Sequence, residues 1–472
     1  MNEAAPPPQS QGPEALEQSL YEVRRKIYPR AVTGWFATWR WSLVWFTQLL
    51  FYGLCWVPWN GRQAVLFELA ERKFYIFGLI FWPQDVFYLA ILLIVAAYSL
   101  FLFTAIGGRL FCGYACPQTV YTEIFLWIEK KIEGDRHVRI KLDGQPLSAH
   151  KLSRKAAKHG AWVAVALWTG FTFVGYFTPI RTLASEVMSL SLGPWETFWI
   201  FFYGFATYGN AGWMREQVCK YMCPYARFQS VMFDPDTLIV TYDAERGEPR
   251  GSRSKKDDHK AGGKGDCVDC GICVQVCPTG IDIRKGLQYE CIGCSACIDA
   301  CDQVMDKMSY PRGLIRYSTE NAIQKKWGRK EIFGHILRPR VMIYGAILML
   351  IIAAAGAGLA MRQPLKVDVI RDRGTLEREE DSGMIENSFR LQIMNVSETA
   401  RRYTIGVSGL PGIEIEHKRS VDIPAATTQS VIVEVHAPPE SGKKGFNRIY
   451  FEVRAVDDEK IAVREPASFL LP

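Results

Sequence analysis

Cysteine is absent from the C-terminal third of this 472-residue chain, because all thirteen cysteines lie before residue 302. This absence excludes a disulfide framework in that part of the protein. No G-x-G-x-x-G stretch follows a strand-like segment, which excludes a dinucleotide site of the Rossmann type. No apolar segment carries paired histidines at its centre, which excludes a transmembrane di-haem relay. Any electrons that the protein handles must therefore come from a partner or from quinol.

The first thirty residues do not show the pattern of a cleavable signal peptide. The first thirty residues are polar and proline-rich, with no apolar core before Trp35, so we expect the N-terminus to stay in the cytoplasm. The net charge of +7 resides largely in basic stretches between apolar segments. Such stretches are typical of cytoplasmic loops in membrane proteins, and we interpret the charge in this way rather than as a sign of nucleic-acid binding.

Apolar residues occur in blocks of membrane length. A spanning helix needs about 20 predominantly apolar residues. Five segments fit this requirement: 36–57, 85–106, 161–180, 195–212 and 340–361. Tryptophans gather in and near these blocks, as they do in the aromatic belts of membrane proteins. We therefore predict a multi-pass protein of the bacterial inner membrane, in contact with lipid.

The charges of the loops orient these segments. Residues 107–160 and 213–338 are rich in lysine and arginine, whereas the loop 181–194 contains only Arg181. Basic loops stay in the cytoplasm. The pattern predicts a cytoplasmic N-terminus, five spans and a periplasmic C-terminal domain.

From residue 363 the apolar pattern changes to a period of two. The alternation is clearest in three triplets: Phe389, Leu391 and Ile393; Val431, Val433 and Val435; and Ile449, Phe451 and Val453. Turn signals such as Pro411-Gly412 and Pro438-Pro439 separate short strands. About seven strands in this length predict an all-β, immunoglobulin-like sandwich.

Eight cysteines are concentrated between Cys267 and Cys301, in two runs of the form C-x2-C-x2-C-x3-C. In two-cluster ferredoxins the fourth cysteine of each run ligates the other 4Fe-4S cluster. We therefore predict two clusters with crossed ligation. The first is expected on Cys267, Cys270, Cys273 and Cys301. The second is expected on Cys291, Cys294, Cys297 and Cys277.

Structural zinc is the alternative for these eight cysteines, because zinc sites also use C-x2-C pairs. A third thiolate at x2 and a fourth at x3, repeated in a second run, is not a zinc-finger spacing, so we favour iron. Pro278 follows the last cysteine of the first run, as ferredoxins lead one to expect, but Asp302 occupies that position in the second. This departure changes the loop without removing a ligand.

A second repeat has the form C-x-Y-x-C-P and occurs at 112–117 and 219–224. Each copy follows a predicted span and is expected at the cytoplasmic edge of the membrane. Cysteines four apart share one face of a helix, where two thiolates can bind a soft ion such as copper. The alternative is that they are small packing residues at helix ends. Because the motif occurs twice, we favour a functional site made of Cys112, Cys116, Cys219 and Cys223, which could bind a soft ion such as copper, carry out catalytic redox chemistry or form a disulfide when oxidised.

Three other residues receive a structural interpretation. Cys55 is expected to pack in the first span, without a chemical role. Arg109 and Arg215 precede the two motifs and could lower thiol pKa values. We interpret both as positive-inside anchors instead.

These features predict a multi-domain protein: an α-helical membrane domain, an inserted ferredoxin-like α+β domain and a β sandwich. The expected divisions are a cytoplasmic segment 1–34, a four-helix membrane domain 35–234, a cytoplasmic two-cluster domain 235–338, a fifth span 339–362 and a periplasmic sandwich 363–472.

The chain resembles the FixG/RdxA/CcoG family of accessory iron–sulfur proteins of cbb-type cytochrome oxidase assembly. The resemblance covers nearly the whole sequence. It is carried by GRLFCGYACPQTVYTE, CKYMCPYARFQSVMFD, the two ferredoxin runs and PRGLIRYSTEN. It implies an oxidoreductase that reduces Cu(II) to Cu(I), with oxidase assembly factors and a copper-transporting ATPase as partners.

Two other functions remain open from the residues alone. Related accessory proteins that combine C-x3-C-P pairs with ferredoxin runs resemble quinol-linked conduits to another redox partner. The protein could also act as a non-enzymatic scaffold whose sandwich binds oxidase subunits. Reduction of copper, reduction of the clusters by quinol, and oxidase assembly without ferredoxin cysteines distinguish the three functions.

Overall fold

The computed structural model describes residues 26–255, 262–371, 378–379, 383–416 and 420–472. The chain forms two compact units. The first comprises the described residues up to Thr47, Phe101–Trp168 and Gly204–Val341, and the second comprises Gln48–Leu100, Thr169–Tyr203 and the residues from Met342 onward. Each passage between the units falls within a helix. These helices are α2 (Trp35–Leu54), α3 (Val86–Gly107), α7 (Ala149–Val174), α9 (Pro194–Thr207) and α16 (Pro339–Ala360).

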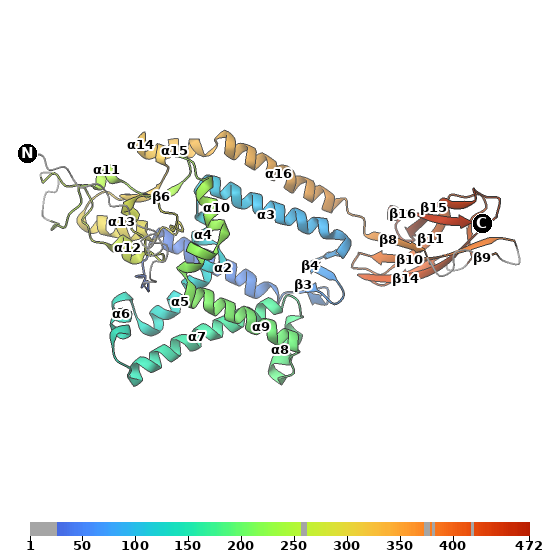
Figure 1. Cartoon of the computed structure of the whole chain (residues 1–472), viewed down its shortest axis with the longest axis horizontal. Coiled ribbons are helices and arrows are strands. Elements are labelled where there is room, and N and C mark those ends of the chain that lie inside the picture. Colours follow the sequence, from blue (N-terminus) through green and yellow to red (C-terminus); the bar gives the residue numbers. More distant parts are fainter. Residues whose placement is uncertain (1–25, 256–261, 372–377, 380–382, 417–419) are drawn as a thin grey trace, which may run out of the picture. The chain divides into compact units, whose positions relative to one another are not determined.

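In the first unit, the cysteine-rich segment folds around a two-stranded sheet, shown in yellow-green in Figure 1. Strand β6 (Ile239–Tyr242) pairs antiparallel with β7 (Ile315–Ser318). Helices α12 (Ile272–Val276) and α13 (Ala296–Met308) pack against each other. The short elements around them are α11 (Ala244–Gly247), η4 (Ile283–Lys285), α14 (Glu320–Gln324) and α15 (Arg329–Ile336). This is the small α+β arrangement that the two cysteine runs predict.

The other part of the first unit is helical. It contains α4 (Leu110–Tyr114), α5 (Pro117–Glu133), α6 (Arg136–Gly144), the π-helical turns η2 (Tyr208–Met214) and η3 (Val218–Met222), and α10 (Pro224–Met232). Phe125 of α5 stacks on Trp162 of α7 with ring centroids 5.2 Å apart. Ile128, Ala166 and Ala211 complete this core. This contact fixes the position of α5, which begins at the end of the first C-x-Y-x-C-P motif.

A buried carboxylate, Glu129, ties these helices together. Its side chain is 2.8 Å from Arg139, 3.1 Å from Arg215 and 3.7 Å from Lys158. Burial opposes ionisation of Glu129, but the three cations outweigh burial and hold the pKa of Glu129 below its ordinary value. A lowered pKa stabilises the fold above the ordinary carboxyl pKa, and this stabilisation is lost as pH falls through the lowered pKa.

Replacing this carboxylate, as in Glu129→Gln, is expected to destabilise the protein by about 3–5 kcal/mol, because buried cations lose their counter-charge. Thermal unfolding in detergent measures the effect. Glu245→Gln is the control, since Glu245 pairs with Lys326 in a largely exposed position and should change stability by less than about 1 kcal/mol. Equal unfolding temperatures for the two variants would contradict a structural role for Glu129.

The second unit begins with two small sheets. A hairpin joins β1 (Pro58–Trp59) and β2 (Arg62–Gln63), and a three-stranded sheet contains β3 (Val65–Glu68), β4 (Lys73–Ile76) and β5 (Leu79–Phe81). After η1 (Pro83–Asp85), α3 runs beside α16 (Figure 1), where the Tyr88 hydroxyl donates to the Gly358 carbonyl at 2.9 Å. Cys55 is 1% exposed and packs with Val174 and Leu183, consistent with a packing role.

The C-terminal part is a sandwich of two antiparallel sheets. One contains β8 (Leu365–Arg371), β9 (Arg378–Glu379), β10 (Ile385–Asn395), β12 (Glu414–Ile415) and β14 (Thr427–Ala437). The other contains β11 (Arg401–Ser408), β13 (Ser420–Ile423), β15 (Gly445–Ala455) and β16 (Ala462–Leu471).

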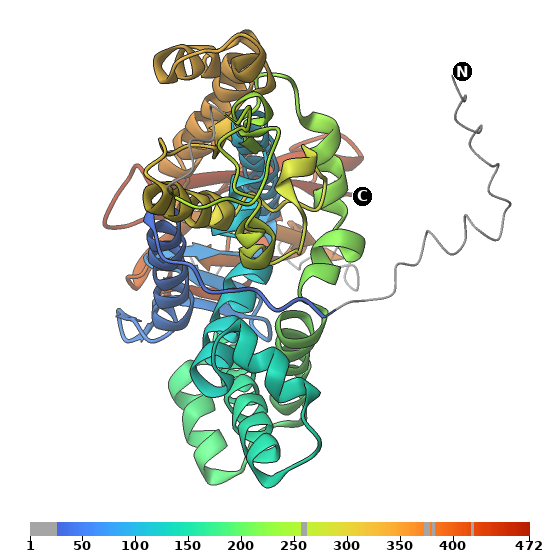
Figure 2. The same cartoon turned by 90° about the vertical axis from the view of Figure 1, so that its left-hand side faces the viewer.

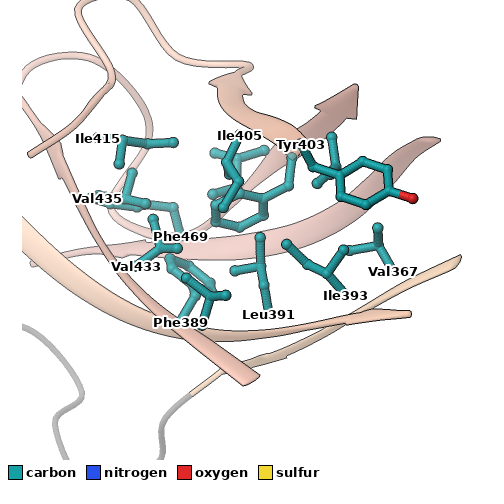
Figure 3. Packing of buried hydrophobic residues seen from close by; sticks show 14 of the residues in the cluster. Val367, Phe389, Leu391, Ile393, Tyr403, Ile405, Ile415, Val433, Val435 and Phe469 are labelled. Carbon is teal, nitrogen blue, oxygen red and sulfur yellow. The ribbon is translucent and has the colours of Figure 1, made fainter. Parts of the chain in front are cut away.

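The core between these sheets comes from the predicted alternation. Phe389, Leu391 and Ile393 are fully buried, whereas Ile432, out of phase with Val431 and Val433, is 55% exposed. Figure 3 shows Phe389, Leu391 and Ile393 in the core together with Tyr403 and Phe469 from the facing sheet. The period-two pattern therefore predicted the sandwich correctly.

The five predicted spans all fall on helices, but five spans are not confirmed. Of the helices in the described ranges, two are long and apolar enough to cross a membrane, Pro83–Gly107 and Pro339–Ala360. Helix α2 contains the buried Arg40, and α7 starts with a basic stretch. Helix α9 has 14 residues before the backbone widens into η2. The expected loop 181–194 is largely helix α8 (Ile180–Ser189).

Candidate iron–sulfur centres and the adjoining cysteine site

The structure brings the first predicted set of four cysteines together. Cys267, Cys270, Cys273 and Cys301 line one small cavity with Tyr242, Met305 and Leu314. Three of these thiols come from the first run and the fourth comes from α13, at the end of the second run. The set has the four sulfur donors that a cubane requires; most of the other lining residues are apolar, while Cys270 is exposed. We call it the first quartet.

The second predicted set surrounds a neighbouring cavity. Cys277, Cys291, Cys294 and Cys297 line it together with Val240, Ile281 and Ile292. Cys273 borders both cavities, so the two lie next to each other. This second quartet again takes one thiol from the other run. The donor chemistry of both quartets fits a 4Fe-4S cluster, and the exchanged fourth cysteines place the two clusters within reach of one another.

The two runs share a backbone conformation that wraps each cavity. Gly271 (φ 63°) and Ser295 (φ 60°) are left-handed at equivalent positions, directly before α12 and α13. Asp269 (φ 52°) and Gly293 (φ 67°) form a second equivalent pair. Left-handed backbone disfavours side chains, so its use at Asp269 and Ser295 indicates a conformation imposed by the site. This internal repeat is not visible from residue identities alone.

The departure at Asp302 has a visible consequence. In the first run, α12 stops at Val276 and Cys277 is extended before Pro278, because a proline disfavours helical backbone in the residue before it. In the second run no proline intervenes, and α13 continues to Met308. The Asp302 carboxylate accepts a hydrogen bond from the Gly313 N–H at 2.9 Å. Asp302 therefore lengthens a helix and fixes the chain that follows it, while all four ligands are retained.

Arginines lie beside cysteines of both quartets. Burial raises the pKa of Cys273 to about 11, and Arg284 acts in the opposite direction. Burial likewise raises the pKa of Cys291 to about 11, opposed by Arg109. Arg40 donates to the Cys294 carbonyl oxygen at 2.5 Å. These cations favour the thiolate form that metal binding requires.

The two C-x-Y-x-C-P motifs are also brought together. Cys112 interacts electrostatically with Cys116 and Cys219, and Cys116 interacts with Cys223. The four thiols of these motifs, Cys112, Cys116, Cys219 and Cys223, therefore form one group, which we call the membrane-edge thiols after the position predicted from the sequence. The expected i, i+4 helical face is wrong for both motifs. Cys116 and Cys223 are extended residues that begin α5 and α10, each followed by a proline in the first turn.

The first of these motifs lies directly on the loop of the second quartet (Figure 2, where α4 is light blue and the loop yellow). A Cβ atom placed on Gly113 would be 2.8 Å from the carbonyl oxygens of Ile292 and Gly293. The Tyr114 hydroxyl hydrogen-bonds with the Ser295 and Tyr317 side chains. The glycine and tyrosine of Cys-Gly-Tyr-Ala-Cys thus join the membrane-edge thiols to the second quartet.

The two arginines that we interpreted as positive-inside anchors are buried in the protein and have specific partners there. Arg109 is 5% exposed, donates to the Ala226 carbonyl and counteracts the burial of Cys112, Cys219 and Cys291. Arg215 is 8% exposed and pairs with Glu129. Their basic character alone does not reveal this, because burial depends on the helices around them.

Two residues that support these sites were not identified from the sequence. Asp299, between two ligands of the second run, accepts the backbone N–H groups of Phe36 and Ala37 and so caps α2. The Cys112 thiol donates to the Gln229 side chain at 3.2 Å. Their residue types carry no signal for these roles, since each contact joins segments far apart in sequence.

In the described ranges no three His, Cys, Asp or Glu side chains are arranged around a single metal ion, and this holds for Cys112, Cys116, Cys219 and Cys223 as well as for the two quartets. The quartets are spaced around cavities instead. This arrangement suits a cluster of several atoms better than a lone ion such as zinc, whose ligands converge on one point.

Family models match most of the chain. Residues 214–320 match a 4Fe-4S dicluster domain, residues 89–134 a 4Fe-4S binding domain, and residues 355–472 the IG-like fold at the C-terminal of FixG. The second match contains Cys112 and Cys116, and the first contains Cys219 and Cys223 as well as both quartets. The predicted iron–sulfur and sandwich domains are therefore confirmed.

Relatives match over most of their length. The nitrogen fixation protein FixG of Rhizobium meliloti is 39% identical over 83% of this chain and 81% of its own. Protein RdxA of Cereibacter sphaeroides is 37% identical over 90% of this chain and 92% of its own. Protein RdxB of the same organism is 38% identical over 84% of this chain and 84% of its own. With its two cysteine quartets, this chain belongs to the FixG/RdxA family and is an iron–sulfur electron-transfer protein of the ferredoxin type.

Proposed function

We propose that this protein passes electrons from its two clusters to Cu(II) at the membrane-edge thiols and releases Cu(I) for cytochrome oxidase assembly. The observation that carries the proposal is the contact of Gly113 with Ile292 and Gly293, which joins the Cys112 motif to the second quartet without an intervening side chain. When bound, the clusters supply one-electron carriers. Each Cu(II) takes one electron and becomes Cu(I), so the copper is substrate and the chain supplies its binding site.

The membrane-edge thiols suit the reduced form of copper. Thiolates are soft ligands and favour Cu(I) over harder ions. Burial raises the pKa of Cys112 to about 12 and that of Cys219 to about 11, so without copper these groups are thiols. Copper binding must displace their protons, and the nearby Arg109 assists because it favours the thiolates. Gln229 accepts from Cys112 and orients it.

The membrane location is part of the proposal. The apolar stretch of α3 has none of its residues buried, and large apolar side chains such as Leu49, Leu92, Phe205 and Leu350 are more than half exposed. Apolar surface of this extent on several helices is suited to lipid and not to water. The chain passes between its two units five times, each time in a predicted span. Five crossings would put the clusters in the cytoplasm and the sandwich in the periplasm.

The family resemblance extends the proposal to partners. We propose that Cu(I) leaves for a copper-transporting ATPase and that assembly factors of the oxidase contact the C-terminal sandwich. The long, paired strands of that sandwich include exposed apolar residues such as Phe446 and Ile370, 71% and 49% exposed.

Replacing one thiol of each motif, as in Cys116→Ser/Cys223→Ser, is expected to lower cupric reduction by about tenfold or more, because copper loses soft ligands. The measurement is formation of Cu(I), trapped by a Cu(I)-specific chelator, after anaerobic reduction of the clusters with dithionite and removal of the excess. Cys55→Ala is the control, since Cys55 lies in the second unit. Undiminished reduction by the double variant, with cluster content unchanged, would contradict copper chemistry at these thiols.

A further inference from the structure

We propose that the cavity bounded by α2, α5 and the second-quartet loop binds a quinol, which supplies the electrons. The cavity has a volume of about 480 Å³, and all residues that line it belong to the first unit. Pockets that bind small molecules have volumes of about 300–1,000 Å³, so the cavity falls within this range. This inference names the electron donor and rests on the proposed function only in requiring electron transfer through the clusters.

One side of the cavity is aromatic. Trp41 of α2 and Trp127 of α5 meet edge to face with ring centroids 6.4 Å apart, and both line the cavity with Trp45. Trp45 is 62% exposed and Trp127 is 48% exposed, so the aromatic wall continues to the outside. Such a wall suits a flat, apolar ring that arrives from the lipid phase, where tryptophans are enriched at the interface.

The lining also contains a polar pair, made of a buried arginine and a partly exposed glutamate. The Arg40 guanidinium lies 3.6 Å from the Glu123 carboxylate and also donates to the Cys294 carbonyl oxygen. The Nε–H of Arg40 is buried and has no acceptor among the described residues. A buried donor without an acceptor is costly. The carbonyl or hydroxyl oxygen of a quinone or quinol, held against the Trp41 ring, would supply one.

The cavity also reaches both redox groups. Cys219 of the membrane-edge thiols and Cys294 of the second quartet both line it. A ligand in the cavity would therefore lie beside a cluster ligand, and the short separation favours electron transfer to that cluster. None of the other cavities described above combines an aromatic wall, a carboxylate and a redox cysteine.

The chemistry of this lining selects a quinol over other donors. Oxidation of a quinol to a quinone releases two electrons and two protons. Clusters held by the two quartets would supply one one-electron acceptor each for these two electrons. The Glu123 carboxylate accepts the protons in turn and passes them to water, to which its side chain is 25% exposed. A nicotinamide donor would need a phosphate-binding glycine loop, which the sequence lacks.

Electrostatics make such a transfer feasible. Reduction adds negative charge to a cluster, and charges and hydrogen bonds near the sulfur atoms set the potential over a wide range. Arg109 beside Cys291 and Arg40 at Cys294 are buried cations at the second quartet. Both stabilise the reduced state and raise the potential toward values that a quinol can reach.

The test follows cluster reduction in the full-length protein in lipid nanodiscs. A short-chain ubiquinol and a short-chain menaquinol are the probes, and EPR or loss of visible absorbance reports reduction. Thr122 lines the cavity, and Thr122→Phe is expected to fill it and slow quinol-driven reduction by tenfold or more. Glu123→Gln keeps the shape of the side chain but removes the proton acceptor, and should slow the same reaction. Glu196→Gln in α9 is the matched control.

Dithionite separates this inference from the proposed function. It should reduce the clusters of every variant fully, which shows that they are assembled, and the reduced variants should then convert Cu(II) to Cu(I) at the normal rate. Quinol reduction of Thr122→Phe at the wild-type rate would overturn the cavity as the quinol site. Failure of both quinols to reduce the wild-type protein, with copper reduction after dithionite intact, would overturn a quinol donor and leave the proposed function standing.

Discussion

Cys277→Ala is expected to remove the second cluster and spare the first, although Cys277 belongs to the first cysteine run. The reason is the exchange of fourth ligands: Cys277 lines the cavity of the second quartet, and Cys301 lines that of the first. Iron should fall from about eight atoms per chain to about four. Cupric reduction should fall by at least about tenfold, because the second quartet is the one that adjoins the membrane-edge thiols.

Metal analysis and EPR after anaerobic purification measure this result. Cys301→Ala is the reciprocal variant and should lose the signal of the other cluster. Loss of the first cluster in Cys277→Ala would show that each run ligates its own cluster. The wild-type iron content carries separate information: about twelve atoms per chain would assign a third cluster to the membrane-edge thiols. That result would contradict copper as their ligand.

Gly113→Ala is the second change with a large expected effect. The added methyl group would be 2.8 Å from two carbonyl oxygens and 2.9 Å from the Cα of Cys294, all of them backbone atoms that cannot rotate away. We expect destabilisation of about 1–3 kcal/mol from overpacking. Because the loop must move away from α4, electron transfer to Cu(II) should also slow by about tenfold or more, since a change of 1.36 kcal/mol in a barrier is tenfold in rate.

Gly160→Ala provides a matched comparison. Gly160 is also helical, in α7, and an added Cβ there meets nothing within 4 Å. Alanine should stabilise that helix by about 0.5–1 kcal/mol. Stopped-flow oxidation of the reduced clusters by Cu(II) and thermal unfolding compare the two variants. If they gave the same rates and the same stability, close packing of α4 on the cluster loop would have no functional importance.

Local patterns were sufficient for the iron–sulfur domain and the sandwich. A cubane ligand set is encoded in the spacing from Cys267 to Cys301, because the loop between ligands must have a fixed length. The alternation at Phe389, Leu391 and Ile393 is likewise local, because successive residues of a strand face opposite sides. In both cases neighbours in the chain are neighbours in the site, so the sequence carries the information directly.

Helix boundaries near the membrane were less predictable. Hydropathy predicted a span at 195–212, but α9 ends at Thr207 and the backbone widens into a π-helix. Arg40 lies inside the predicted span 36–57, yet its partners are Glu123 and the Cys294 carbonyl. An average of apolarity over a segment does not reveal that one charged residue, Arg40, is buried against a partner more than 80 residues away.

By itself, the sequence determined the family and the presence of a sandwich after the last cysteine, and it predicted the two sets of cysteines that the fold gathers around two cavities. Only the tertiary structure decided how the two C-x-Y-x-C-P motifs relate to those clusters. The motifs are 107 residues apart, and the fold brings their thiols into one group while α4 packs on the loop of the second quartet. Spacing along the chain records local geometry, whereas such a meeting depends on packing between helices, which no local pattern specifies.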